Sequence, residues 1–247
     1  KEAVELLSAA KPPSGLMTVI SDPDIAGILA HEVMGHASEA DEVLRQRSFL
    51  SKAVGNRVGS SAVTMIDDGT VEQAFGSIPF DCEGTPSSRT VIIQNGVYRG
   101  FMHSLETSGE FRTKATGNAR AQDFTRRVFV RMTNTFFEPG DATLDEIIEE
   151  TKDGLLAVQG ISGMEDPVGG GFQVRVLRGY TIKNGEKKDH VRSFTLTGKA
   201  LDILKTVDFV GKEFELSGGN CGKGEEDWVP VTSGGPYMRA KIIVGGG

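Results

Sequence analysis

Cysteine and long apolar runs are scarce in this sequence, and each scarcity excludes a class of protein. Cys82 and Cys221 are the only cysteines among 247 residues, which is too few for a small secreted domain built on disulfides. No apolar run approaches the roughly 18 residues that a membrane span needs. The start of the chain shows no signal-peptide pattern, and its end shows no lipidation motif. We therefore expect a cytoplasmic protein that does not enter a membrane.

Blocks of basic residues are also missing. The net charge is −7, from 27 Lys and Arg against 34 Asp and Glu. Proteins that bind nucleic acids usually carry a basic stripe that neutralises phosphates. The densest group of arginines lies within residues 110–131, and Glu110 and Asp123 are mixed into it. Direct nucleic-acid binding is therefore not expected, although a local anion site stays open.

Glycine, in contrast, is abundant, at 32 of 247 residues, against a usual share of roughly 7%. Much of it stands between strand-like runs, and Asn95-Gly96 and Asn184-Gly185 are hairpin-turn signals. The predicted strands are 16–20, 62–66, 90–94, 97–102, 128–132, 155–159, 172–177, 180–183 and 238–244. The predicted helices are 1–11, a bent or restarted helix from about 22 to 44, 143–152 and 196–205. This pattern favours an α+β fold with a large, mainly antiparallel sheet and a few packed helices.

A candidate metal motif lies on the second of these helices. The stretch from His31 to His36 reads His-Glu-Val-Met-Gly-His, which resembles the HExxH zinc signature with one extra residue. In a regular α-helix, residues five apart are rotated by about 140°, so the two imidazoles would point apart. A π-type turn realigns them, and Gly35 tolerates that distortion. We predict a π-bulge or a helix break across residues 34–36.

The alternative interpretation of the motif is that two of four histidines fall close together by chance. Glu39 and Asp41 follow within two turns and could accept hydrogen bonds from ligand imidazoles. They could equally form a solvated helix face.

Five further stretches extend the motif into a longer pattern. They are residues 67–70 (DDGT), 83–86 (EGTP), 116–118 (TGN), 131–135 (RMTNT) and 219–223 (GNCGK). In this order, from about Ser21 onward, the sequence resembles the TldD/PmbA family, whose members are also named modulators of DNA gyrase.

The resemblance implies a set of roles and partners. His31, His36 and Cys221 would be the ligands of one zinc ion per chain, and Glu32 would be the catalytic base. Because PmbA-type (TldE) subunits lack the histidine motif, the chain resembles the catalytic TldD half of a dimer, formed with itself or with a TldE-type subunit. Family members carry a further N-terminal region. We therefore expect residues 1–247 to be one catalytic metallopeptidase domain, the C-terminal portion of a longer protein.

The chemistry of these residues agrees with that implication. Two histidines and a cysteine with one open position are a reasonable catalytic zinc set, although iron or cobalt could also occupy it. Such a zinc ion lowers the pKa of its water towards roughly 7, and Glu32 could move the proton to the leaving amine. We expect no catalytic role for His103 or His190, and Cys82 is left as structural or free.

A glycine run and two alternative functions complete the predictions. Gly169, Gly170 and Gly171 resemble a family glycine run before a strand, where an extended peptide could pair by β-augmentation; the alternative is a hairpin entry. We expect a zinc-dependent peptidase that cleaves small or unfolded peptides. One alternative is a regulatory peptide- or protein-binding module of the gyrase-modulator type with a structural metal. The other is an inactive subunit, against which the retention of Glu32 and all three ligands argues.

Overall fold

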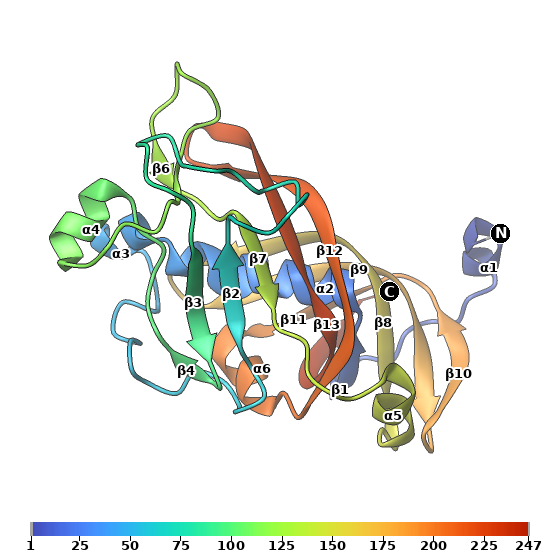
Figure 1. The fold of residues 1–247 in the computed structure, drawn as a ribbon. Coiled ribbons are helices and arrows are strands. Elements are labelled where there is room, and N and C mark those ends of the chain that lie inside the picture. The colour runs from blue at the N-terminus through green and yellow to red at the C-terminus, as the bar shows by residue number, and fades with distance from the viewer. Residues whose placement is uncertain (1, 247) are drawn as a thin grey trace.

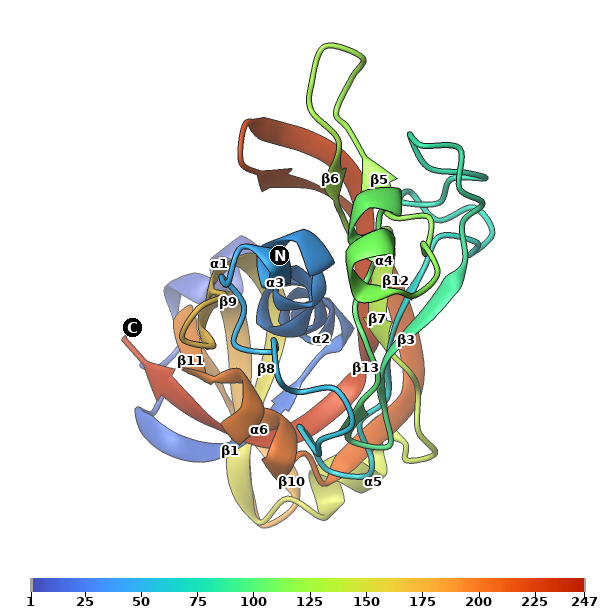
Figure 2. The ribbon, with the colours of Figure 1, turned by 90° about the vertical axis from the view of Figure 1, so that its left-hand side faces the viewer.

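The computed structural model describes residues 2–246, so Lys1 and Gly247, the ends of the predicted domain, lie outside the described residues. The first predicted helix begins on one of these two residues. The rest of the chain is built on an eleven-stranded sheet that curls around a central helical segment, as Figure 1 and Figure 2 show. None of the helices in residues 2–246 has the length and apolar character needed to cross a bilayer.

The helices are short. They are α1 Glu2–Leu7, α2 Pro23–Ile28, α3 Ala40–Leu44, α4 Leu105–Phe111, α5 Leu144–Glu149 and α6 Ala200–Thr206, and a π-helix Leu29–Gly35 and a 3₁₀ turn His36–Ser38 lie between α2 and α3. The strands are β1 Gly15–Ser21, β2 Met65–Asp68, β3 Arg89–Gln94, β4 Val97–Tyr98, β5 Ala119–Arg120, β6 Phe129–Val130, β7 Asn134–Phe137, β8 Asp153–Asp166, β9 Gly171–Lys183, β10 Glu186–Val191, β11 Phe194–Lys199, β12 Phe209–Lys223 and β13 Glu226–Gly245.

The long strand β13 joins the two halves of the sheet. Its C-terminal part pairs antiparallel with β1 and β11, and its N-terminal part pairs with β7 and along the length of β12. The path runs β1-β8-β9-β11-β13-β7-β2-β3-β4, with β10 beside β9 and β12 beside β13. Only the β1–β8 and β7–β13 pairs in the described chain are parallel. The predicted α+β class with a mainly antiparallel sheet is confirmed.

The helical segment from α2 to α3 packs inside the curl of the sheet. Its buried side chains include Ile25, Ala30 and Met34, which belong to the main hydrophobic core together with residues of β8, β9 and β11. The approach to β13 is close, because a Cβ on Gly27 would lie 2.6 Å from the Gly234 nitrogen. Glycine at this position therefore lets the helix reach the sheet, and the sheet fixes the place of the metal motif.

Several elements begin or end at other residues in the structure than the sequence predicts. Residues 196–199 are strand rather than helix, because they pair with β9 on one side and β13 on the other; helix α6 begins at Ala200. Strand β4 ends at Tyr98, and β13 begins at Glu226 rather than at 238. The predicted turns at Asn95-Gly96 and Asn184-Gly185 are confirmed, with positive φ at all four residues.

Some elements had no sequence signal. Strand β12 contains four glycines, and its exposed stretch Ser217–Asn220 has no apolar alternation. Strands β7 and β10 and helix α4 were likewise not predicted. Long-range pairing, rather than local pattern, makes β12 a strand.

Candidate metal centre

The helix that carries the two histidines changes its geometry at the motif. Asp22 caps α2 by accepting a hydrogen bond from the Ile25 N–H at 2.9 Å. From Leu29 to Gly35 the helix is of the π type, and the His36 N–H donates to the carbonyl of His31, five residues earlier. This realigns positions five apart, as the motif requires. The predicted distortion is confirmed, and it begins earlier than predicted.

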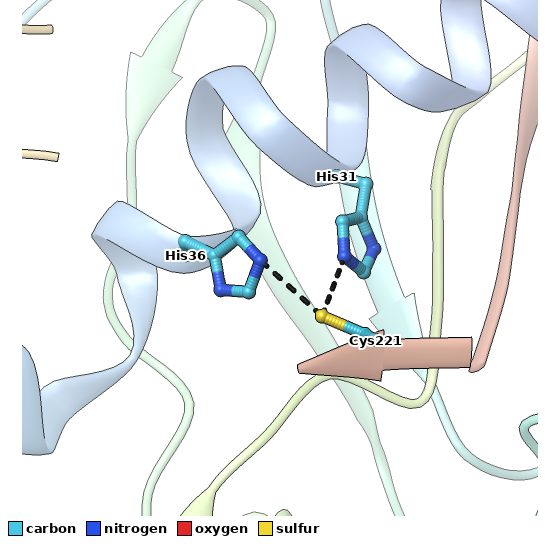
Figure 3. Close-up of side chains that lie close together, drawn as sticks. All are labelled: His31, His36 and Cys221. Carbon is cyan, nitrogen blue, oxygen red and sulfur yellow. Dashed lines mark hydrogen bonds between the residues drawn. The ribbon is translucent and has the colours of Figure 1, made fainter. Parts of the chain in front are cut away.

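The two imidazoles converge on one sulfur from the opposite strand (Figure 3). His31 Nε2 lies 3.0 Å from the Sγ of Cys221, and His36 Nε2 lies 3.3 Å from the same sulfur. The two rings are nearly perpendicular, at an interplanar angle of 87°. Cys221 belongs to β12, so residues 185 and 190 positions apart meet here.

This donor set fits a zinc ion. The three ligand atoms lie within 4.8 Å of one another, and a tetrahedral zinc with Zn–N of about 2.1 Å and Zn–S of about 2.3 Å requires N···S separations of roughly 3.5 Å. All three residues are at least nine-tenths buried. The three predicted ligands therefore come together in one place with suitable chemistry.

Electrostatics favours the ligand form of the cysteine. Burial alone would raise the pKa of the Cys221 thiol, but the His31 and His36 imidazoles outweigh it and lower that pKa to about 5. Burial opposes protonation of His36, yet the Glu39 carboxylate holds its pKa well above the usual value. Thiolates bind metals, and metal uptake here would release the proton of His36.

Glu32 lies beside the ligands, and a second carboxyl group that the sequence did not reveal lies next to it. Glu165, near the end of β8, lies close to Glu32: one carboxylate oxygen of each and a ring nitrogen of His36 all lie within 4.8 Å of one another. Burial, aided by Glu165, raises the pKa of Glu32 to about 7. Gly163 on β8 gives Glu32 room, because a Cβ there would lie 2.5 Å from the Glu32 Cγ. Glu165 reaches Glu32 because β8 packs against the π-helix, a contact between residues far apart in the sequence.

The two predicted supporting carboxylates have different positions. Glu39, fully buried, accepts a hydrogen bond from His36 Nδ1 at 3.3 Å, so it orients this imidazole with Nε2 towards Cys221. Asp41 does not contact either imidazole; its Oδ1 lies 2.7 Å from Lys223 Nζ. Its predicted contact with a ligand is thus replaced by a contact with a buried lysine.

The glycine run forms a turn rather than an open edge. Gly169 and Gly170 close the β8–β9 hairpin, and their N–H groups donate to Asp166. Gly171 pairs with Asp166 on β8 and with Lys199 on β11. Strand neighbours on both sides leave Gly171 no free edge, so the peptide pairing predicted for this run does not carry over to it.

The remaining histidines and cysteine have other surroundings. His103 packs against the rings of Phe101 and Phe111, and its Nδ1 contacts Thr107. The ring of His190 stacks on Tyr180. Cys82 is a free, exposed cysteine.

Two clefts flank the ligands. One of about 290 Å³ is lined by residues that include His36, Glu165, Arg45 and Lys223. The other, of about 330 Å³, is lined by His31, Glu32 and the small residues of β8, β12 and β13. The ligand group thus separates two spaces that open to the surface, one on the His31 side and one on the His36 side.

Comparison with known proteins gives consistent matches over nearly the whole chain. Residues 14–246 match the sequence profile of the PmbA/TldA metallopeptidase C-terminal domain. A metalloprotease of Methanocaldococcus jannaschii is 45% identical over 242 residues, which are 98% of this chain and 53% of that protein. A zinc metalloprotease TldD homolog of Saccharolobus solfataricus is 34% identical over 248 residues, 100% of this chain and 55% of that protein. The chain thus spans about half the length of the curated relatives it matches.

The fold is shared with a solved structure as well. TldE from Thermococcus kodakarensis superposes with a TM-score of 0.79 at 21% identity, over 98% of this chain and 53% of that one.

Proposed function

This chain belongs to the PmbA/TldD metallopeptidase family, and on that premise we propose that it is the catalytic part of a zinc-dependent peptidase. The observation that carries the proposal is the meeting of His31, His36 and Cys221, with Glu32 beside them. The substrate would be a small or unfolded peptide, entering by the two clefts that flank the ligands.

The residues have separate roles in this proposal. His31, His36 and Cys221 would hold the metal, and a zinc ion there supplies a Lewis acid for the scissile carbonyl and an acidified water. Glu32 would take a proton from the attacking water and deliver it to the leaving amine. A pKa of about 7 suits this exchange, because the carboxyl group can both accept and release a proton near neutral pH. Glu165, whose carboxylate lies close to that of Glu32, would help to hold the Glu32 carboxyl group in place.

The number of ligands favours catalysis over a structural metal. Structural zinc sites usually have four protein ligands, and catalytic ones have three with an open position. The imidazole–thiolate cluster found in residues 2–246 has three protein ligands, two histidines and one cysteine. A regulatory binding module with a closed site is therefore less well supported than a peptidase.

Partners and location belong to the same proposal. We propose that the whole protein acts as a dimer in the cytoplasm, with a second copy or with a TldE-type subunit. The support is the family and the fold shared with a protein named TldE.

Replacing Glu32 by glutamine tests the proposal. Glu32→Gln keeps the size of the side chain and removes the base, so cleavage of an unstructured peptide by the full-length protein should fall by about 10²–10⁴-fold or more. Metal content should stay unchanged, because Glu32 is not a ligand. Glu110→Gln, on the exposed face of α4, is the matched control and should cleave normally. Undiminished cleavage by Glu32→Gln would overturn the peptidase mechanism.

A further inference from the structure

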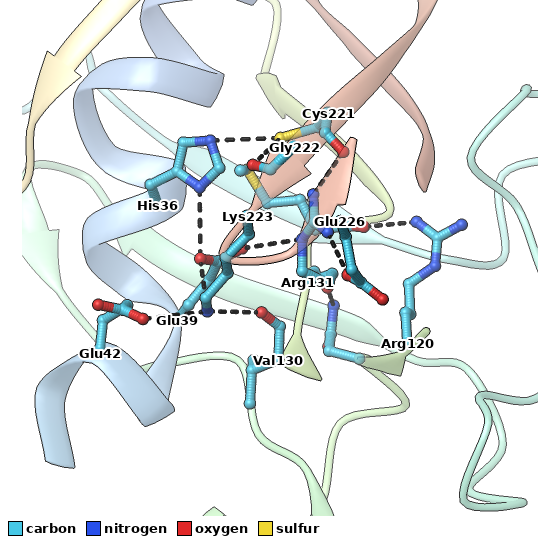
Figure 4. A network of polar contacts seen from close by, with 12 residues as sticks. His36, Glu39, Glu42, Arg120, Val130, Arg131, Cys221, Gly222, Lys223 and Glu226 are labelled. Atoms are coloured by element: carbon cyan, nitrogen blue, oxygen red, sulfur yellow. Dashed lines mark hydrogen bonds and ion pairs between the residues drawn. The ribbon is translucent and has the colours of Figure 1, made fainter. Parts of the chain in front are cut away.

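A buried arginine lies behind the metal ligands and belongs to neither cleft. Arg131 follows the short strand β6, and its side chain is completely buried. Its Nη1 lies 2.6 Å from Oε2 of Glu226, which is equally buried. A buried guanidinium without partners would be strongly destabilising, so the groups that accept its hydrogen bonds must stay close to it. Its other partners are Cys221 itself and Glu39, which follows the 3₁₀ turn that begins at His36 (Figure 4).

The first of these connections reaches the cysteine. Arg131 Nη2 donates to the backbone carbonyl of Cys221 at 2.7 Å. The β12–β13 ladder is irregular between Cys221 and Lys223, so this part of the strand is not fixed by regular pairing alone. The arginine supplies a hydrogen bond at this irregularity. It therefore sets the backbone from which the thiol of Cys221 projects.

The second connection reaches the histidine. Arg131 Nε lies 3.9 Å from Glu39 Oε1, and Glu39 Oε2 accepts the hydrogen bond from His36 Nδ1. Lys223, two residues after Cys221, holds the same carboxylate from the other side, with Nζ 3.0 Å from Oε2. The carboxylate that orients His36 is thus held by two cations from the cysteine side of the site.

We propose that Arg131 is a positioning residue of the metal centre, which holds Cys221 and, through Glu39, His36 in one geometry before the metal binds. The inference rests on the metal site proposed above. Its consequence is that the site is preorganised, so that little rearrangement opposes metal binding. An arginine is needed because its rigid, forked guanidinium donates to Glu226 and to the Cys221 carbonyl and also places Nε 3.9 Å from Glu39, which a lysine ammonium does not do.

A structural arginine elsewhere in the fold provides the control. Arg239 also joins a carboxylate to a backbone carbonyl, with Nη2 2.8 Å from Asp208 Oδ2 and Nη1 2.9 Å from the Glu150 carbonyl oxygen. Its contacts do not include a metal ligand. Arg131→Lys and Arg239→Lys therefore make the same change in chemistry, one behind the metal site and one away from it.

The experiment measures Co²⁺ binding by the full chain, with the thiolate-to-cobalt charge-transfer band as the spectroscopic readout and thermal unfolding as the test of folding. Arg131→Lys should weaken Co²⁺ binding by about 10–100-fold, the usual effect of losing an outer partner of a metal ligand, and should alter the band. Arg239→Lys should lose stability and keep the wild-type affinity and band. Glu39→Gln, which leaves Arg131 intact and removes the charge beside His36, should also weaken binding, and it covers the case in which Arg131→Lys does not fold.

The outcomes separate the two proposals. If wild-type protein shows no charge-transfer band that depends on Cys221, the metal site itself is wrong. If wild-type protein shows that band but folded Arg131→Lys has unchanged affinity and spectrum, the positioning role is overturned and the metal site stands. If Arg131→Lys cannot be folded, unchanged affinity and spectrum in Glu39→Gln lead to the same conclusion. Equal weakening in Arg131→Lys and Arg239→Lys would also overturn it, because the effect would then be one of general stability.

Discussion

Gly35 and Met132 are packed so closely that a Cβ on Gly35 would lie 2.2 Å from the Met132 sulfur and 3.2 Å from the Ala30 carbonyl oxygen. Gly35 ends the π-helix that aligns the two histidines, and Met132 follows Arg131 in the chain. The distorted helix therefore fits against the segment behind the metal centre only because position 35 has no side chain.

Gly35→Ala should destabilise the protein by about 1–3 kcal/mol, because an added methyl group must displace a buried neighbour. It should also weaken metal binding, since His36 is the next residue. Urea unfolding and Co²⁺ titration measure the two effects. Adding Met132→Ala makes room, so the double variant should be more stable than the sum of the two single losses predicts. Gly109→Ala is the control, because a Cβ there meets nothing within 4 Å; strict additivity of Gly35→Ala and Met132→Ala would contradict the account.

His103 should make the protein less stable in acid. Burial lowers the pKa of His103 from 6.5 to about 4. Because the unfolded chain binds a proton at this histidine more readily than the folded protein does, the free energy of unfolding is highest above pH 6.5 and decreases as the pH falls towards 4. At pH 4.5 the free energy of unfolding is lower by about 2–3 kcal/mol than at neutral pH because of this histidine.

The test compares urea unfolding at pH 7.5 and pH 4.5. His103→Phe keeps the ring contacts with Phe101 and Phe111 but cannot take up a proton, so it should lose less stability on acidification than wild type. His190→Phe, on another part of the sheet, should lose as much as wild type does. If wild type and His103→Phe lose the same stability between pH 7.5 and pH 4.5, this histidine does not cause the loss of stability in acid.

Asp67 connects three of the motif stretches that the sequence shows outside the metal centre. Its buried carboxylate accepts hydrogen bonds from Asn118 Nδ2 at 2.7 Å, from the N–H and hydroxyl of Thr133 at 2.9 and 2.8 Å, and from the Thr135 hydroxyl at 2.7 Å. These contacts give the three stretches a structural role beside the site.

Asp67→Asn should cost about 2–4 kcal/mol, because an amide N–H₂ group would face donors and leave a buried polar group unsatisfied. Thermal or urea unfolding measures the loss. Asp227→Asn, at an exposed position, should be nearly neutral. A stable Asp67→Asn variant would mean that the carboxylate is not the acceptor on which these stretches depend.

The metal motif could be predicted from the sequence because its geometry is local. Two histidines five positions apart and the glycine at position 35 were enough to predict the π distortion that brings His31 and His36 together. Cys221, in contrast, came from the family resemblance, because its strand has no strand-like pattern and is formed by pairing with β13. The sequence could not reveal Glu165 either, since the register of β8 against β9, with a shift between Gly160 and Ser162, decides where it lies. Arg131 belongs to one of the motif stretches, but its burial behind the site depends on contacts with residues about 90 positions away, which the local sequence does not reveal.

Metal content is the measurement that tests the central claim most directly. Inductively coupled plasma mass spectrometry would be applied to untagged protein that has never met a chelator, as wild type, His31→Ala, Cys221→Ser and the control Cys82→Ser. The account predicts about one zinc per chain in wild type and Cys82→Ser, and loss of that zinc in both His31→Ala and Cys221→Ser. Folded wild-type protein without metal, or a Cys221→Ser variant with a full complement of zinc, would contradict it.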